Sequence, residues 1–279
     1  MTYDLPFRTI SHRHLTVEGY SRAAVQSCWR VPELKLGFDI GALPAGFGET
    51  ATWFISHGHL DHLGALPMLA AARQRLRLCP PTVYVPAPIA AEVRRLLKAW
   101  EAVTRRPLKC HIVGVDAGQE LLTADGHFIA TFPTRHTVPS LGFMVWERPR
   151  TKSLTDGAPQ AEPRRCQCRE EPLQTHDGKP LICYTGDTSP EGLDENPEVF
   201  QARILITELT FVDPRHRRDL IHKHGHLHLD DFIARSDRFE NELIIAAHVT
   251  ARSTAAQVHR WLARAVPASL RDRLCVWVS

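Results

Sequence analysis

A run of metal-ligand side chains directly behind an apolar segment constrains this chain more than any other feature. The run follows the apolar residues 54–56 and consists of His57, His59, Asp61 and His62. Imidazole and carboxylate groups suit zinc, manganese or iron. Such closely spaced groups converge only where the chain turns sharply, as in a loop between a strand and a helix. Because a helical pattern opens at residue 63, the run predicts a metal site in a strand-to-helix loop rather than a polar loop that merely holds three histidines.

Three later apolar runs are each followed closely by one more ligand-type residue. These residues are His136, Asp187 and His248. A single histidine at a strand end is more often structural than a ligand. The three occur in order behind the 57–62 run, however, in a chain with 16 histidines. We therefore expect them to complete the metal site.

Short runs rich in β-branched and aromatic residues recur along the chain and predict strands. They lie at residues 34–40, 53–56, 82–85, 111–115, 127–132, 141–146, 181–185, 204–207, 242–247 and 274–278. Helical spacing of apolar residues predicts helices at 63–76, 89–103, 229–235 and 254–266. Runs of strands with helices between some of them indicate an α/β fold, in which two sheets pack together with helices outside.

Residues 148–179 interrupt this pattern, since they are polar, rich in Pro, Arg, Glu and Gln, and almost without apolar periodicity. Candidate ligands lie on both sides of the segment. We therefore expect a loop or protruding arm inside a single domain that spans residues 1–279.

Composition excludes several classes of protein. A net charge of +3 is too weak to argue nucleic-acid binding by itself. The N-terminus lacks the apolar core of a signal peptide, and no stretch approaches the ~18 apolar residues of a membrane span. The seven cysteines are scattered and odd in number. They predict reduced thiols and a cytoplasmic protein, with a Cys166/Cys168 metal clip as the less favoured alternative.

The ordered ligands resemble those of the metallo-β-lactamase superfamily. That resemblance implies an αβ/βα four-layer sandwich with two metal ions between the sheet edges. It places His57, His59 and His136 on one ion, and Asp61, His62 and His248 on the other. Asp187 would bridge the two ions. Zinc is the expected metal, with manganese and iron as alternatives.

Within that superfamily the chain is similar to the short, plant-type ribonuclease Z family. The similar segments are Glu18-Gly19-Tyr20-Ser21 and residues 32–41, 56–67, 80–86, 184–188, 207–211 and 225–226. The resemblance implies cleavage of precursor tRNA at its 3′ side, and a homodimer. It also implies Asp61, Glu208 and His226 as catalytic residues, with Asp61 serving as a metal ligand as well. A histidine held by a carboxylate suits protonation of the leaving oxygen of a phosphodiester.

The substrate is less firmly indicated than the chemistry. Where the family pattern after the last metal histidine ends in Arg-Tyr, this chain has Arg252-Ser253. A hydrolase of small phosphodiesters, thioesters or lactones is therefore the alternative, since a fold does not fix a substrate. A metal-bound nucleic-acid-binding protein without catalysis is a third hypothesis, against which the full ligand set argues.

The neighbourhood of His226 leaves two further questions open. His222, His224 and His228 surround it, so a basic solvated loop is an alternative to a catalytic role. Three basic clusters could bind phosphates: Arg94, Arg95 and Lys98; Arg105, Arg106 and Lys109; and Arg215, Arg217, Arg218 and Lys223. We favour only the last, because of its position beside His226.

Overall fold

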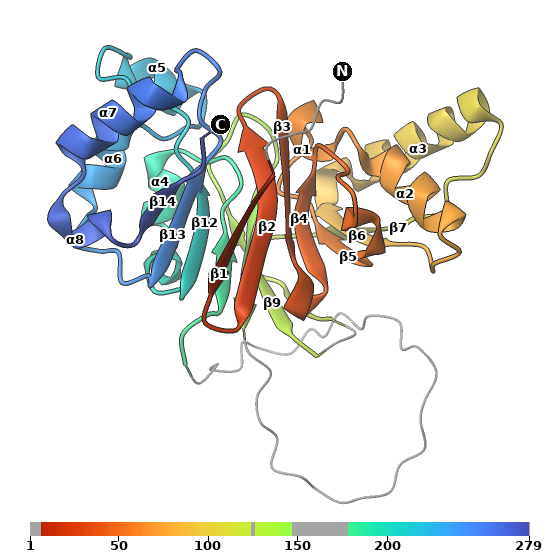
Figure 1. The fold of residues 1–279 in the computed structure, drawn as a ribbon. Helices are drawn as coiled ribbons and strands as arrows, with labels where there is room; N and C mark the ends of the chain where they lie inside the picture. The colour runs from red at the N-terminus through yellow and green to blue at the C-terminus, as the bar shows by residue number, and fades with distance from the viewer. Residues whose placement is uncertain (1–6, 124–125, 147–177, 279) are drawn as a thin grey trace, which may run out of the picture.

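The computed structural model describes residues 7–123, 126–146 and 178–278, and two seven-stranded sheets form its centre (Figure 1). The predicted arm at 148–179 lies outside the described residues except for its last two positions.

The first sheet has the strands in chain order. They are β1 (Arg8–His12), β2 (Leu15–Arg22), β3 (Gln26–Val31), β4 (Leu36–Ile40), β5 (Thr52–Phe54), β6 (Thr82–Pro86) and β7 (His111–Val115). Strands β1 to β4 pair antiparallel, whereas β4 to β7 pair parallel. The carboxyl ends of β4, β5 and β6 therefore reach the same edge of the sheet.

The second sheet repeats this plan. Its strands are β8 (Glu120–Leu122), β9 (Phe128–Pro133), β10 (Leu141–Trp146), β11 (Ile182–Tyr184), β12 (Ile204–Glu208), β13 (Leu243–Ala247) and β14 (Leu274–Val276). Strands β8 to β11 pair antiparallel and β11 to β14 pair parallel. The two sheets are joined at one edge, where Leu141 N donates to Ser56 O at 2.9 Å and His57 bridges Ser140.

Helices cover the outer face of each sheet (Figure 1). The first sheet carries α1 (Leu60–Leu63), α2 (Leu66–Arg75) and α3 (Ala90–Thr104). The second carries α4 (Pro190–Asp194), α5 (Arg218–Lys223), α6 (Leu229–Ala234), α7 (Ala255–Ala265) and α8 (Ala268–Arg271). Short 3₁₀ helices lie at Pro32–Leu34, Phe47–Glu49, Ala87–Ile89 and Pro197–Phe200. Among the described residues, no helix combines the length and apolarity needed to cross a membrane.

Three apolar clusters hold these four layers together. The central one lies between the sheets and stacks aromatic rings, including Phe38, Phe54 and Phe143, all fully buried. The other two lie between each sheet and its own helices. Because burial of apolar surface is the main favourable term in folding, the central cluster is what fixes the sheets face to face. The predicted α/β fold with two packed sheets is confirmed.

The differences from the sequence-based expectation have a common cause. The strands that are buried along nearly their whole length have apolar runs that are visible in the sequence, and these are β4, β5, β6, β10, β11, β12 and β13. Strands β1 to β3 and β8 were not predicted. The first half of β2 alternates between buried and half-buried positions, and β1 has no buried residue. The predicted helix 63–76 was also wrong in detail, because it divides into α1 and α2, and α2 begins next to Pro67.

The stability of the sheet sandwich can be tested at Phe143, whose ring centroid lies 5.3 Å from that of Phe54. Phe143→Ala should lower the free energy of unfolding by about 3–5 kcal/mol, because it leaves a cavity between the sheets. Denaturant unfolding measures the change. The control Val103→Ala, at a side chain that is 75% exposed, should change it by less than ~0.5 kcal/mol. Equal effects would mean that the sheet interface is not the stabilising core.

Candidate metal centre

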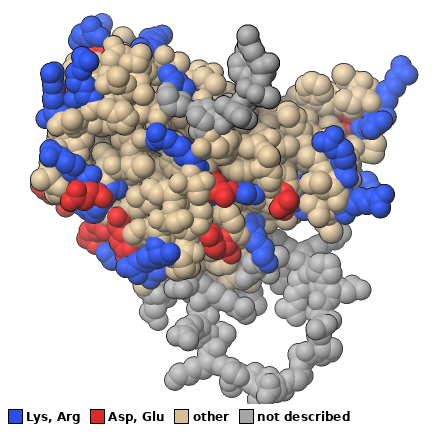
Figure 2. All heavy atoms as spheres, in the orientation of Figure 1, with Lys and Arg blue, Asp and Glu red and all other residues tan. Residues whose placement is uncertain are grey.

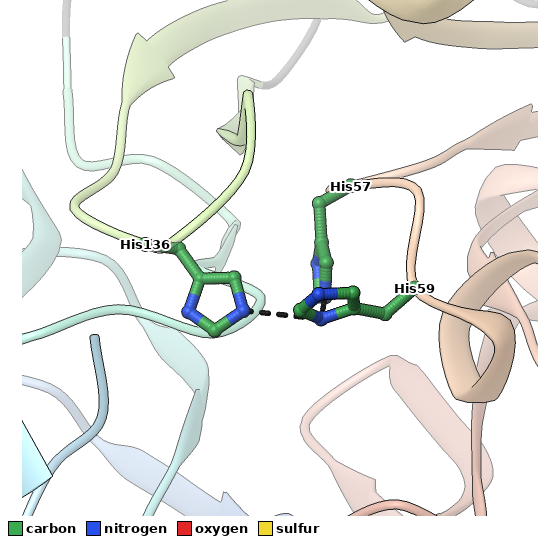
Figure 3. Close-up of side chains that lie close together, drawn as sticks. All are labelled: His57, His59 and His136. Atoms are coloured by element: carbon green, nitrogen blue, oxygen red, sulfur yellow. Dashed lines mark hydrogen bonds between the residues drawn. The ribbon is translucent and has the colours of Figure 1, made fainter. Parts of the chain in front are cut away.

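The loop after β5 brings the first histidines to the edge where the sheets meet. His57 is fully buried, and His59 precedes the first turn of α1, which contains Asp61 and His62. His57 Nε2 and His59 Nδ1 lie 3.0 Å apart. His136, from the loop after β9, brings its Nε2 to 3.2 Å from His59 Nδ1. The three rings thus converge from both sheets, with one nitrogen of each facing the others (Figure 3).

A second group of donors lies beside the first. The Nε2 atoms of His62 and His248 are 3.2 Å apart. Asp61 Oδ2 lies 3.4 Å from His248 Nε2 and 3.7 Å from His62 Nε2. His248 follows β13, so this group also draws on both sheets.

Asp187 lies between the two groups, in the loop after β11. Its Oδ2 is 3.5 Å from His62 Nε2 and 3.9 Å from His57 Nε2. Burial raises the pKa of this carboxyl, but His248 and His62 outweigh burial and hold the pKa well below its ordinary value. Asp187 is therefore an anion placed to contact both groups.

The donor separations fit tetrahedral metal ions. Ligand nitrogens at 2.0–2.1 Å from a zinc ion lie about 3.3 Å from one another. The separations of 3.0 and 3.2 Å in the first group and 3.2 and 3.4 Å in the second are close to this value. Burial, assisted by neighbouring imidazoles, lowers the pKa of His57 and of His136. Both are thereby kept neutral, which is the form that binds metal.

Sequence reasoning assigned no role to Asp39, which supports both groups from behind. Asp39 is fully buried and accepts hydrogen bonds from Ser56 N at 2.6 Å, Ser56 Oγ at 2.7 Å and His62 Nδ1 at 2.6 Å. The Tyr184 hydroxyl donates to it as well. Because Ser56 Oγ donates to Asp39, it accepts from His57 Nδ1 at 3.0 Å. Both imidazoles are thus turned to offer Nε2 to a metal. The signal in the sequence is a carboxylate within an otherwise apolar strand.

Gly225 orients the ring of His136 through Nδ1, as Asp39 and Ser56 do for His62 and His57. His136 Nδ1 donates to the Gly225 carbonyl at 3.0 Å. Gly225 has a left-handed backbone (φ 69°), and a Cβ there would lie 2.6 Å from His136 Cα. Only glycine therefore permits this close approach.

Glu208 and His226 form a pair at the edge of the metal ligands. His226 Nδ1 lies 3.0 Å from Glu208 Oε1. The buried Glu208 carboxylate also accepts from the backbone amides of Thr188 at 2.8 Å, Leu227 at 3.1 Å and Thr210 at 3.3 Å. Burial lowers the pKa of His226, but the Glu208 carboxylate outweighs burial and raises the pKa to about 9.

The other histidines around His226 have different surroundings. His228 is buried and caps α6, and His222 contacts Asp231 at 2.8 Å. His224 is exposed and lines the cleft described below. The structure thus brings His226, and neither His222 nor His228, to the predicted metal ligands.

A cleft of about 1580 Å³ opens over the centre. Its walls differ in chemistry. The N-terminal half contributes the exposed apolar residues Val25, Leu60 and Met68, and the C-terminal half contributes Arg215, Arg217 and Arg252. Figure 2 shows Lys and Arg side chains gathered over the helices of the C-terminal half, at its upper left.

Two of the three predicted basic clusters have members that are held in ion pairs. Arg95 and Lys98 on α3 form ion pairs with Glu92 and Glu101, as solvated helix faces commonly do. Arg215 and Arg217 line the cleft, but each is paired with an aspartate two residues away, Asp213 and Asp219 respectively. The Arg217–Asp219 pair is exposed and contributes little to stability, whereas Asp213 is buried and holds Arg215 by three side-chain hydrogen bonds.

The sequence is similar to those of known proteins, and the similarities agree with one another. Residues 46–158 match the model of the beta-lactamase superfamily domain. The chain is 30% identical over 265 residues to tRNase Z TRZ1 of Arabidopsis thaliana, covering 92% of this chain and 93% of that protein. It is 37% identical over 150 residues to the nuclear ribonuclease Z of Triticum aestivum, covering 53% of this chain and 85% of that one.

Solved structures agree on the fold. The metallo-beta-lactamase fold protein YhfI from Bacillus subtilis superposes with a TM-score of 0.61 at 14% identity, covering 88% of this chain and 90% of that one. The human tRNase Z, short form, gives 0.51 at 19% identity, covering 87% and 89%. These likenesses confirm the predicted metallo-β-lactamase four-layer sandwich.

The donor geometry predicts the metal content. Protein purified without chelator should carry close to two divalent ions per chain, as elemental analysis would show. Asp187→Ala should lower the content of both ions, because its carboxylate contacts both groups. The control Asp194→Ala, at an exposed carboxylate paired with Arg235 and Arg238, should leave it unchanged. A folded chain that reproducibly carries no metal would contradict the prediction.

Proposed function

Because the chain belongs to the ribonuclease Z family of metallo-β-lactamase-fold proteins, we propose that its substrate is precursor tRNA, cut at the 3′ side. The chain is a metal-dependent hydrolase of the ribonuclease Z type, and the proposal concerns what it cuts and which residues do so. The proposal is supported by the Glu208–His226 pair, which suits proton donation to the leaving group of a phosphodiester. The pair lies beside the proposed metal ligands, in a cleft with basic residues on one wall.

The proposed metal ligands divide into the two groups described above. His57, His59 and His136 would hold one ion, Asp61, His62 and His248 would hold the other, and Asp187 lies where it could reach both. We assign zinc to both positions, because the donors are imidazoles and carboxylates at tetrahedral separations. Bound zinc supplies a Lewis acid and lowers the pKa of water, so that hydrolysis proceeds at neutral pH.

Asp61 has a second connection that favours a role beyond ligation. The backbone amide of Ala24, in the β2–β3 turn, donates to Asp61 Oδ2 at 2.9 Å. The His248 hydrogen bond and the charges of His62 and His248 outweigh burial, so the pKa of Asp61 falls to about 2. Asp61 therefore remains an anion that can orient a water molecule at the floor of the cleft.

The observation that carries the proposal is the position of His226. Its Nδ1 is held by Glu208, so Nε2 is left for the substrate. Its ring centroid lies 5.1 Å from that of His136 and 5.8 Å from that of His248. A proton on Nε2 is therefore available to the alkoxide that departs when a phosphodiester is cut. Activated esters and lactones have less need of such a proton donor.

Two further proposals concern assembly and location. We assign the exposed apolar side chains of Leu60 and Met68, which are 80% and 59% accessible, to a homodimer contact. Sedimentation of the purified protein tests this assignment.

A cytoplasmic location is the expectation that follows from thiol usage, and the five cysteines within the described residues are unpaired.

The substrate is tested by assaying the zinc-loaded protein on a precursor tRNA and on bis(p-nitrophenyl) phosphate in parallel. The proposal expects specific cleavage of the tRNA at the 3′ side. Turnover of the small diester without any cleavage of tRNA would replace the proposal by the hydrolase of small phosphodiesters.

The acid role of His226 gives a mutational prediction. His226→Ala should lower kcat on precursor tRNA by about 10²–10⁴, because the leaving alkoxide loses its proton donor. Two ions should remain bound. Substrates with a nitrophenolate leaving group should be affected far less, because that group departs without protonation.

The exposed His259 on α7 provides the matched control, and His259→Ala should change neither rate. Equal losses on poor and good leaving groups would show that His226 positions the substrate and does not protonate it.

A further inference from the structure

The hydroxyl of Thr210 lies at the point where the acid pair meets the metal ligands. Thr210 follows β12 and is 2% exposed. Its Oγ1 is 2.5 Å from Glu208 Oε2, 3.0 Å from His248 Nδ1 and 3.4 Å from His226 Nδ1. Thr210 is neither one of the proposed metal ligands nor a member of the Glu208–His226 pair.

The direction of these hydrogen bonds follows from the partners. A hydroxyl has one proton to donate, and the Glu208 carboxylate can only accept. Thr210 therefore donates to Glu208, and its lone pairs accept from the Nδ1–H of His248. Asp187 Oδ1 is the competing acceptor for that proton, but at 3.4 Å it is farther away than the hydroxyl.

We infer that Thr210 is a positioning residue that connects Glu208 to the metal ligand His248. The carboxylate acts on two imidazoles at once, directly on His226 and through the Thr210 hydroxyl on His248. With Nδ1 protonated, His248 offers Nε2 to the ion that it shares with Asp61 and His62. Such partners of a metal-bound histidine fix its tautomer and raise its basicity.

The backbone conformation of His248 explains why its ring needs a positioning hydrogen bond of its own. His248 has a left-handed conformation (φ 62°), which is strained for a residue other than glycine. Leu209 N donates to Ala247 O at 2.7 Å, and Thr250 N donates to Thr210 O at 2.9 Å. These bonds bracket His248 and fix its backbone, while the Thr210 hydroxyl fixes its ring.

The inference rests on the proposed ligand role of His248, and its test measures zinc binding without any substrate. Thr210→Val keeps the shape of the side chain and removes the hydroxyl. In competition with a chromophoric chelator, it should weaken the affinity for one of the two zinc ions by about 10–100-fold. The other ion, held by His57, His59 and His136, should bind as in the unchanged protein. Thr210→Ser should restore the lost affinity to within a few fold.

A matched control comes from β12, the strand that Thr210 follows. Thr207 is equally buried, and its hydroxyl accepts from Thr185 Oγ1 at 2.9 Å. Thr207→Val removes a buried hydroxyl of the same kind and should leave both zinc affinities unchanged. If Thr210→Val fails to fold, Thr210→Ala tests how loss of the same hydroxyl changes the zinc affinity.

The connection to Glu208 is tested by a double-mutant cycle. Glu208→Gln should lower the affinity for the same zinc ion when it is introduced into the unchanged protein. In the Thr210→Val variant it should lower that affinity little further. His226→Ala should leave both zinc affinities alone, which separates this inference from the proposed acid role. Two zinc ions bound at full affinity by Thr210→Val would overturn the inference, as would an equal loss in Thr210→Ser or additive effects in the cycle.

Discussion

The buried carboxylate of Asp39 is the interaction on which the rest of the site depends. It belongs to β4 of the first sheet, and the Tyr184 hydroxyl that donates to it belongs to β11 of the second. A buried charge is tolerated only where hydrogen bonds compensate for lost water, and here donors arrive from both sheets and from α1. The carboxylate therefore aligns the sheets and orients the ligand His62 through the same set of bonds.

Much of this centre could be predicted from sequence, because its proposed ligands follow apolar strand segments. His136, Asp187 and His248 stand behind apolar runs that are visible without a structure. The structure brings them together with the 57–62 run through the parallel halves of the sheets, in which strand ends share an edge. The assignment of each donor to an ion came from resemblance, since spacing alone does not state which donors converge.

What the sequence could not predict are contacts between distant side chains. Nothing local marks Thr210 as a partner of His248, or Gly225 as the partner of His136, because both contacts arise only when loops from several strands meet. The basic run around Arg215 was misleading in a different way. Its charges looked free, but aspartates two residues away lie within ion-pair distance of Arg215 and Arg217. Strands β1 to β3 and β8 were missed because their apolar residues are few or are interrupted by polar ones.

The wide separation of the ligands along the chain has a consequence for the cell that makes this protein. The proposed ligands His62 and His248 are 186 positions apart in the sequence. Domains form as they leave the ribosome, N-terminal part first. The growing chain therefore contains His57, His59 and His62 before His136, Asp187 and His248 have been synthesised. A hydrolase built this way cannot assemble both proposed donor groups until residue 248 has been synthesised.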